Sequence, residues 1–182
     1  MSHMSAVCGH CLKAGPAFDC VLSTFRYQMP VDALIYAMKH AEGINLMRTL
    51  VPELAKKIAA FYPDERWPDC LVPVPMHWLR LWRRGFNQAF YLAKALQMAL
   101  PRKLPIRDLV KRKGSALAQK HLTRLKRQKN VENNFIMRKP CLSEHVAIVD
   151  DVVTTGATCE ALAQLLKEQG VQRVDVWSLA RA

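Results

Sequence analysis

The stretch that most constrains the fold is residues 146–158, which reads V-A-I-V-D-D-V-V-T-T-G-A-T. Its first four residues are apolar and mostly β-branched, and such a short run predicts a strand that is buried on both faces. Two carboxylates, Asp150 and Asp151, come where we expect this strand to end. Small residues follow, and then apolar residues at helical spacing. The stretch therefore predicts a strand, a loop and a helix of an α/β protein.

The loop between this strand and this helix has the composition of a phosphate-binding site. Backbone N–H groups of such a loop and of the first helical turn point at one spot, where the helix dipole adds positive charge. A glycine lets the backbone approach an anion without a Cβ in the way. The residues of this cradle are Thr154, Thr155, Gly156, Ala157 and Thr158. The alternative is a generic turn followed by a helix, with two solvated aspartates.

Carboxylates do not bind phosphate, but they accept hydrogen bonds from sugar hydroxyls and hold hydrated Mg²⁺. A phosphate, sugar hydroxyls and a metal together describe a ribose 5-phosphate group. The stretch resembles the signature of type I phosphoribosyltransferases, in which an apolar strand precedes an acidic pair and a T-G-x-T loop. The resemblance implies a central, mainly parallel sheet flanked by helices. It also implies a site for 5-phosphoribosyl 1-pyrophosphate (PRPP), in which Asp150 and Asp151 bind the ribose and Mg²⁺.

Periodicity and turn residues predict the other elements of this sheet. We expect Thr158 to cap the helix after the cradle and Gly170 to end it. A strand, a helix and a further strand form a βαβ unit, which requires a parallel sheet. The remaining elements are strands at 18–27, 70–75 and 171–179, and helices at 31–41, 46–62 (with a break at Pro52) and 86–100. Pro73 should end the strand at 70–75 or place it at an edge.

Positive charge is concentrated in one third of the chain. The net charge is +12, and residues 80–139 hold 17 Lys and Arg against two acidic residues. Such a segment favours polyanions, either a pyrophosphate-bearing substrate or nucleic acid. The alternative is a solvated basic face.

Residues 77–84 predict a non-helical loop that ends at Gly85. Three arginines ahead of a helix suit a second anion site. The phosphoribosyltransferase resemblance gives this loop the pyrophosphate, through His77, Arg80, Arg83 and Arg84. Trp78 and Trp82 pack over the loop or stack on bases; we favour packing, because indoles usually supply buried area.

A second basic stretch, residues 111–130, admits two interpretations. Residues 121–133 form either an exposed helix that aids solubility or part of a flexible catalytic loop that closes over pyrophosphate. In the second case the contacts come from Arg124, Arg127 or Lys129.

The first residues contain a C-x-x-C knuckle, Cys8 and Cys11. Structural zinc needs four ligands, and only these two have the expected spacing, although His10 and Cys20 are possible additions. We expect residues 1–20 to hold a tag remnant and half of a zinc ribbon, with an incomplete zinc site or a metal-free stub. Residues 21–182 then form the phosphoribosyltransferase-like domain. Six cysteines without a signal peptide indicate a reducing, cytoplasmic setting.

Motifs spread over nearly the whole chain narrow the resemblance to the ComF/GntX family. They are F-x-Y-x-x-P-V-x-x-L-I-x-x-M-K from residue 25, V-P-V-P-x-H from 72, R-x-x-R-R-G-F-N-Q from 80, and Q-x-x-L, R-x-x-N and Phe135 ahead of the acidic pair. The resemblance implies natural competence, in which internalised single-stranded DNA is handled together with a cytosolic DNA helicase-translocase.

Three hypotheses for function follow. In the first, the protein binds PRPP as a phosphoribosyltransferase-like protein of the competence system, with an unknown acceptor. Purine salvage is disfavoured, because Thr154 stands where 6-oxopurine enzymes carry an aspartate. In the second, it is a single-stranded DNA-binding module without transferase activity. The third, a PRPP-responsive transcriptional regulator, ranks last because no helix-turn-helix pattern is present.

Overall fold

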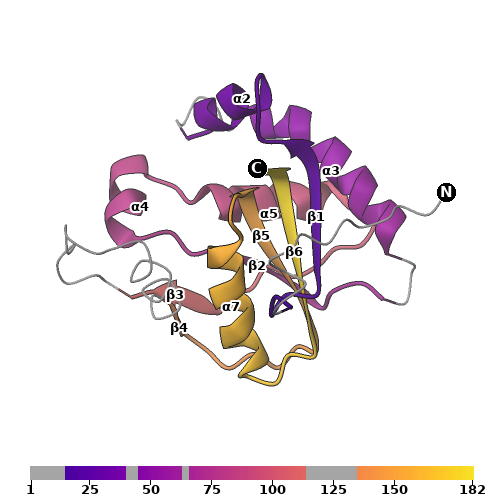
Figure 1. Cartoon of the computed structure of the whole chain (residues 1–182), viewed down its shortest axis with the longest axis vertical. Helices are drawn as coiled ribbons and strands as arrows, with labels where there is room; N and C mark the ends of the chain where they lie inside the picture. The colour runs from indigo at the N-terminus through magenta and orange to yellow at the C-terminus, as the bar shows by residue number, and fades with distance from the viewer. Residues whose placement is uncertain (1–14, 40–44, 63–65, 114–134) are drawn as a thin grey trace.

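Four parallel strands, in the order β1-β6-β5-β2, form the central sheet of the computed structural model (Figure 1). The strands are β1 (Cys20–Arg26), β2 (Cys70–Pro73), β5 (His145–Val153) and β6 (Arg173–Arg181). The structure describes residues 15–39, 45–62, 66–113 and 135–182. The parallel sheet predicted from the sequence is confirmed, and β2 ends at Pro73 as expected.

Helices cover both faces of this sheet and leave one hydrophobic core on each side. On one face lie α2 (Val31–Ala37), α3 (Met47–Phe61) and α5 (Gln88–Ala99). On the other lie α7 (Ala157–Lys167) and the antiparallel strand pair of β3 (Val110–Arg112) and β4 (Phe135–Met137). Figure 1 shows α7 in front of the sheet and α5 behind it. The short helix α4 (Trp78–Arg84) has no buried residue.

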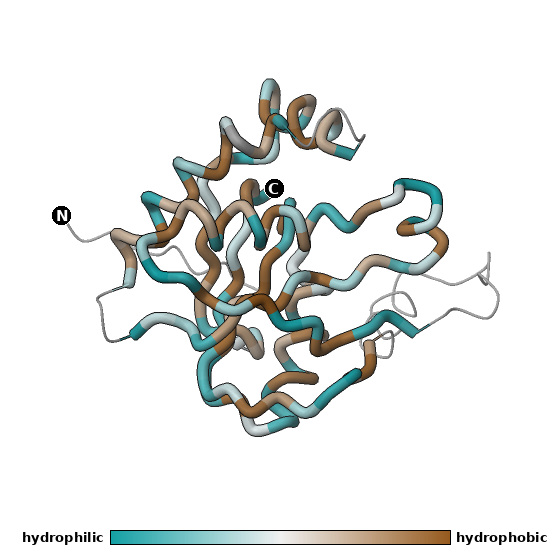
Figure 2. Tube along the Cα trace, turned by 180° about the vertical axis from the view of Figure 1, so that it is seen from behind, coloured by the Kyte–Doolittle hydropathy of each residue, from teal (hydrophilic) through white to brown (hydrophobic). Residues whose placement is uncertain are grey.

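The start of β5 is buried on both faces, as its β-branched run predicts. Val146 and Ile148 pack in the core under α7, whereas Ala147 and Val149 pack in the core under α3 and α5. Seen from behind, the central strands are largely brown, the colour of hydrophobic residues (Figure 2). This double burial positions β5 rigidly, and with it the two aspartates at 150 and 151.

Strand β5 is longer than expected. It pairs with β6 as far as Val153, so Asp150 and Asp151 lie inside the strand rather than after its end. The following helix has Gly156 as its N-cap, and Thr158 lies within the helix instead of capping it. Its last residue is Lys167, and the left-handed Gly170 comes three residues later, in the turn toward β6.

The predicted break at Pro52 is absent, because α3 runs continuously through that proline. Pro52 is the sixth residue of the helix, so it lacks the N–H that would donate to the carbonyl of residue 48. Leu54 and Ile58 are fully buried beyond it, and their burial stabilises the continuous helix. None of the described helices is long and apolar enough to cross a membrane.

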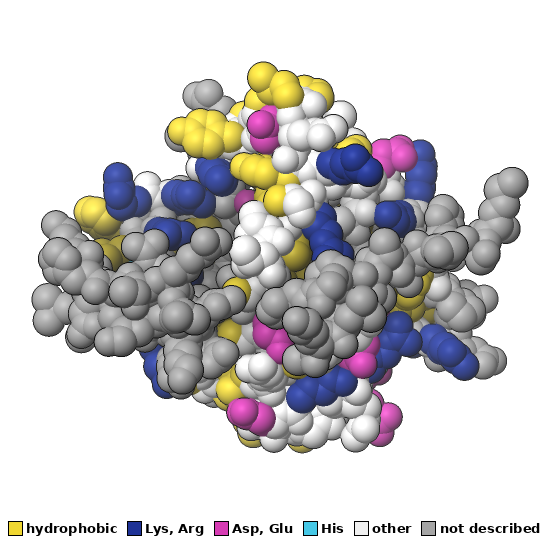
Figure 3. All heavy atoms as spheres, in the orientation of Figure 1, with side chains coloured by type: hydrophobic (Ala, Val, Ile, Leu, Met, Phe, Trp, Pro, Cys, Tyr) yellow, Lys and Arg dark blue, Asp and Glu magenta, His cyan; other side chains and the backbone are white. Residues whose placement is uncertain are grey.

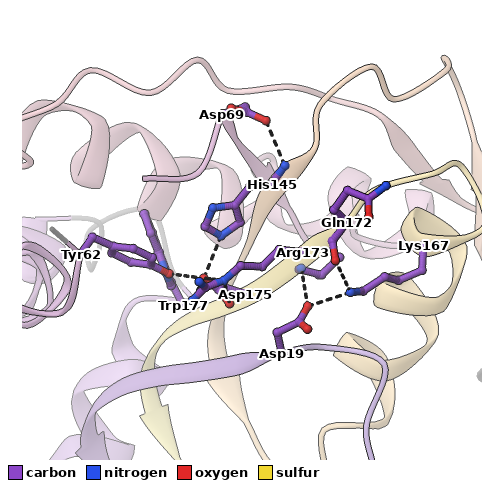
Figure 4. Close-up of polar contacts among 10 residues, drawn as sticks. Asp19, Tyr62, Asp69, His145, Lys167, Gln172, Arg173, Asp175 and Trp177 are labelled. Atoms are coloured by element: carbon purple, nitrogen blue, oxygen red, sulfur yellow. Dashed lines mark hydrogen bonds and ion pairs between the residues drawn. The ribbon is translucent and has the colours of Figure 1, made fainter. Parts of the chain in front are cut away.

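A buried polar network ties α3 to the sheet at the amino ends of β5 and β6 (Figure 4). Asp175 of β6 is fully buried and accepts hydrogen bonds from the Tyr62 hydroxyl, from His145 Nε2 at 2.8 Å and from Arg173 Nε at 3.1 Å. Trp177 Nε1 donates to the Tyr62 oxygen at 3.1 Å. The network satisfies a buried carboxylate completely, which makes it a structural element.

Candidate functional site

The direction in which the chain winds reverses between β2 and β5. Leu71 of β2 pairs with Ala147 of β5 on one side and forms a parallel bridge with Ile106 on the other. From β2 the chain passes through α5 to this outer bridge, whereas from β5 it passes through α7 to β6 in the opposite direction. In open parallel sheets, ligands bind beyond the carboxyl ends of the two strands at such a reversal.

A cavity of about 220 Å³ lies at this point. It brings together residues from two parts of the predicted PRPP site: Asp150, Asp151 and Thr158 from the ribose 5-phosphate part, and Arg80 and Arg84 from the pyrophosphate part. Its other lining residues are Lys39, Val74, Pro75, Met76, Asn87, Gln88, Ala89 and Arg112. The cavity therefore contains both the carboxylates suited to a ribose and the cations suited to phosphate groups.

Each carboxylate of the acidic pair accepts a hydrogen bond from the backbone of the next residue. Asp150 Oδ1 accepts from the backbone N–H of Asp151 at 2.9 Å, and Asp151 Oδ1 accepts from that of Val152 at 2.9 Å. Burial raises the pKa of Asp150 well above its usual value, and the negative charge of Asp151 raises it further. A cation or hydroxyl donors beside the pair would favour its ionised form. The pair therefore suits Mg²⁺ or a sugar.

Four basic side chains line the same cavity: Lys39, Arg80, Arg84 and Arg112. Burial lowers the pKa of Arg112, and the positive charge of Arg80 lowers it further. Among the described residues, no ion pair joins these cations to Asp150 or Asp151. The cations outnumber the acidic residues two to one, so the cavity favours an anionic ligand.

The junction of α4 and α5 holds Arg84 at the cavity wall. Gly85 ends α4 with a φ of 78°, a conformation that favours glycine, and its N–H donates to Leu81 O at 2.7 Å. Asn87 caps α5 through its side chain and donates from Nδ2 to Val74 O at 3.0 Å. Gln88 is 3% exposed and accepts from Arg84 Nη1 at 2.8 Å, while its Nε2 has no partner among the described residues.

The predicted phosphate loop lies beside the cavity, at the N-terminus of α7. Gly156 has a φ of 78°, and this conformation rather than lack of space requires glycine, since an added Cβ would meet only Phe18 at 3.8 Å. Thr154 and Thr155 are exposed, and Thr155 Oγ1 accepts from the Ala157 N–H at 3.4 Å. Of the five residues predicted for this loop, Thr158 lines the cavity itself.

Relatives of this chain are named as competence proteins or DNA utilization proteins. It is 35% identical over 181 residues to Competence protein F of Haemophilus influenzae, covering 96% of this chain and 78% of the relative. It is 34% identical over 182 residues to DNA utilization protein YhgH of Salmonella typhimurium, covering 99% and 80%. The chain belongs to the ComF family. Competence protein ComFC of Bacillus subtilis is 27% identical over 150 residues, which is 81% of this chain and 58% of that protein.

No protein-family model matches this ComF-family chain. Solved structures similar to it include a purine phosphoribosyltransferase from Pyrococcus horikoshii, with a TM-score of 0.45, 16% identity, and coverage of 75% of this chain and 82% of that one. A hypoxanthine phosphoribosyltransferase from Staphylococcus aureus gives a TM-score of 0.48, 17% identity, and coverage of 76% and 64%. Both TM-scores are below 0.5.

The predicted loop at residues 77–84 is wrong, because this part of the ComF-family chain forms helix α4. His77 does not line the cavity; it caps the helix, and its Nδ1 accepts from the Leu79 N–H at 3.3 Å. Arg83 is exposed outside the cavity. The packing interpretation of the two tryptophans is also wrong, since Trp78 is 60% and Trp82 is 81% exposed.

Four polar residues of the cavity were missed from the sequence: Lys39, Asn87, Gln88 and Arg112. The first three lie within motifs that carry the ComF resemblance. Those motifs could have identified them as candidate site residues. Arg112 belongs to a run of basic residues in which no single position stands out.

The zinc prediction for Cys8 and Cys11 and the loop contacts of Arg124 and Arg127 lie outside the described residues. Within the described residues, no group of three or more His, Cys, Asp or Glu side chains is placed to hold a metal ion. Cys20 lies in β1, where burial raises the pKa of its thiol to about 11.

Proposed function

We propose that the cavity at the carboxyl ends of β2 and β5 binds PRPP. We further propose that this binding serves the competence role of the ComF family. The observation that carries this proposal is the convergence of Asp150, Asp151 and Thr158 with Arg80 and Arg84 on one cavity. Carboxylates that accept from ribose hydroxyls and guanidinium groups that bind pyrophosphate are the two halves of a PRPP site.

In this proposal, Asp150 and Asp151 accept hydrogen bonds from the 2- and 3-hydroxyls of the ribose. The loop at residues 154–158 takes the 5-phosphate through backbone N–H groups, the Thr hydroxyls and the N-terminus of α7. Arg80 and Arg84 bind the pyrophosphate. Mg²⁺ held by the aspartates would neutralise part of the charge on that pyrophosphate.

A phosphoribosyl transfer at this site would break the bond between C1 of the ribose and the pyrophosphate oxygen, and the electron pair would leave with the pyrophosphate. An acceptor nucleophile would then form a bond to C1 through an oxocarbenium-like transition state. The protein's part would be to hold the ribose and stabilise the leaving charge. These residues do not identify the acceptor, so the proposal concerns PRPP binding.

A second candidate function is the handling of single-stranded DNA, together with a DNA helicase-translocase. Two observations favour it: the names of the relatives, which refer to competence and DNA utilization, and the excess of basic residues between 80 and 139. A protein that contacts several phosphates should lose affinity for single-stranded DNA steeply as the salt concentration rises. A flat salt response would contradict this function.

Calorimetric titration of PRPP, with and without Mg²⁺, tests the first proposal. We expect saturable binding that is strengthened by Mg²⁺ and lost in Asp150→Asn/Asp151→Asn. Asp108→Asn is a matched control, because Asp108 is exposed, lies outside the cavity and forms an ion pair with Arg138 at 3.4 Å. Absence of PRPP binding to the wild-type protein, or equal binding by the double variant, would contradict the proposal.

A further inference from the structure

Helix α4 presents two tryptophans to solvent, although indoles usually contribute buried area. Trp82 is among the most exposed large hydrophobic side chains of the described residues, and none of the seven residues of α4 is buried. Leu79 and Leu81 of the same helix are also exposed. A contiguous apolar surface of this kind marks an interaction site more often than a folding requirement.

The spacing of residues gives α4 two different faces. Trp78 and Trp82 are four residues apart and share one face. Arg80 and Arg84 are likewise four apart, and both line the cavity that contains the acidic pair. The helix has no acidic residue in its sequence W-L-R-L-W-R-R. Residues two apart lie on nearly opposite sides of a helix, so the tryptophan face is turned away from the face that carries Arg80 and Arg84. Arg83 is exposed outside the cavity and lies between these two faces. Figure 3 shows dark blue basic side chains beside yellow hydrophobic ones over α4, at the left of the view.

We propose that α4 is a stacking platform for the unpaired bases of a single-stranded nucleic acid, with Trp82 and Trp78 as the stacking residues. The guanidinium group of Arg83, which is exposed outside the cavity, binds a phosphate beside those bases. This inference rests on the second proposed function and adds the surface that would perform it.

The chemistry of α4 favours this occupant over others. Stacking on an indole requires a base face that is free, as in a single strand, whereas duplex bases present only their edges. His77 already stacks on Trp78, with ring centroids 6.0 Å apart and an angle of 29° between the planes, so this surface supports stacked rings. The apolar face is about two turns long, much shorter than the amphipathic helices that bind membrane surfaces. An acidic peptide would use the arginines but would leave the indoles without a partner.

Quenching of tryptophan fluorescence would report selectively on ligands that contact α4. The chain has four tryptophans, and the other two are buried: Trp67 is 7% and Trp177 is 0% exposed. A base that stacks on α4 should therefore quench the emission of the exposed pair and leave that of the buried pair unchanged. Titration with an oligothymidylate of about 12 nucleotides, which is within the range of known single-strand sites, gives this readout together with an affinity.

The variants to compare are Trp78→Ala/Trp82→Ala, Trp78→Phe/Trp82→Phe and, as a matched control, Met98→Ala on α5, whose side chain is 86% exposed. An abasic oligomer of the same length supplies the phosphates without the bases. We expect the wild-type protein to bind oligothymidylate with quenching, and the Ala variant to bind it at least tenfold more weakly. The Phe variant should recover most of this affinity, because phenylalanine retains an aromatic face. Met98→Ala should bind as the wild type does, and affinity for the abasic oligomer should be the same in all variants.

Three outcomes would overturn the platform. The first is equal oligothymidylate affinity in the wild-type and Ala proteins; the second is binding without quenching. The third is binding to vesicles of anionic lipid that depends on the tryptophans while oligothymidylate binding does not, since that would make α4 a membrane-contacting surface.

The same experiment separates this inference from the functions on which it rests. A wild-type protein that binds no oligothymidylate would contradict both the DNA-handling function and the platform. A wild-type protein that binds it equally well without the tryptophans would contradict only the platform. PRPP titration into the Ala variant should match the wild type, because neither tryptophan lines the cavity.

Discussion

Arg84 donates a hydrogen bond from Nη1 to Oε1 of Gln88, at 2.8 Å, across the junction of α4 and α5. Gln88 is almost completely buried and is the first residue of α5. Its amide therefore holds the guanidinium of Arg84 at the cavity wall, opposite the acidic pair. The Nε2 of Gln88 has no partner among the described residues, so its two N–H groups could donate to a ligand in the cavity.

Replacing Gln88 with Leu should weaken PRPP binding by about tenfold, because Arg84 loses a hydrogen bond that fixes its position. Calorimetry measures this affinity. Gln97→Leu is the matched control, since Gln97 lies on the same helix and donates to Leu104 O at 2.6 Å away from the cavity. Equal loss of affinity in both variants would indicate a general effect of altering α5.

Gly156→Ala should lower the free energy of unfolding by about 1–2 kcal/mol, because alanine is strained at a φ of 78°. It should also weaken PRPP binding, since the strained loop holds the 5-phosphate. Gly170→Ala provides the comparison, because Gly170 has a φ of 93° in the turn after α7. We expect similar destabilisation by urea titration in both variants, with the loss of PRPP affinity confined to Gly156→Ala. Unchanged affinity in that variant would contradict a role for the loop.

The network around Asp175 should make the free energy of unfolding depend on pH in the acidic range. Burial alone would raise the pKa of Asp175, but hydrogen bonds from His145, Tyr62 and Arg173 outweigh it and lower the pKa. A carboxylate with a lowered pKa in the folded state stabilises the protein fully above its unfolded pKa, near 3.9. This contribution is lost as the pH falls through the lowered folded value.

Asp175→Asn should therefore reduce the free energy of unfolding by about 3 kcal/mol at neutral pH, because charged hydrogen bonds in a buried site are lost. Its stability should also vary less with pH between about 5 and 2 than that of the wild type. Urea unfolding across this range measures both effects. Asp108→Asn, which removes an exposed ion pair, should cost less than about 1 kcal/mol. A pH dependence unchanged by Asp175→Asn would show that other groups control acid unfolding.

The sequence predicted the parts of the fold whose signals are local. The β-branched run at 146–149 identified the central buried strand, and Pro73 identified the end of β2. Helix α4 was missed because its exposed residues give no apolar stripe facing a core. Its limits depend on a His77 cap and on Gly85 in a left-handed conformation. The continuity of α3 through Pro52 was missed because tertiary burial, rather than propensity, decides it.

In the sequence, only the phosphoribosyltransferase resemblance assigned the acidic pair and the arginine-containing segment to one PRPP site. The acidic pair and the arginines were recognised individually, but only the sheet topology shows that Arg80 and Arg84 lie on the same cavity as Asp150. Lys39 follows the C-terminal end of α2 and Arg112 belongs to β3, and both line the cavity. No sequence pattern predicts that residues so far apart in the chain lie close together. The Asp175 network joins residues more than one hundred positions apart and gave no sequence signal.

The central claim is that one cavity holds both ends of a single ligand. Calorimetric titration of PRPP, ribose 5-phosphate and pyrophosphate into wild-type protein and Arg80→Ala/Arg84→Ala, all with Mg²⁺, tests it most directly. The account predicts that PRPP binds more tightly than either fragment, and that the variant lowers the PRPP affinity to about that of ribose 5-phosphate without changing the latter. Equal PRPP affinity in the variant and the wild type, or an equal loss for PRPP and ribose 5-phosphate, would contradict it.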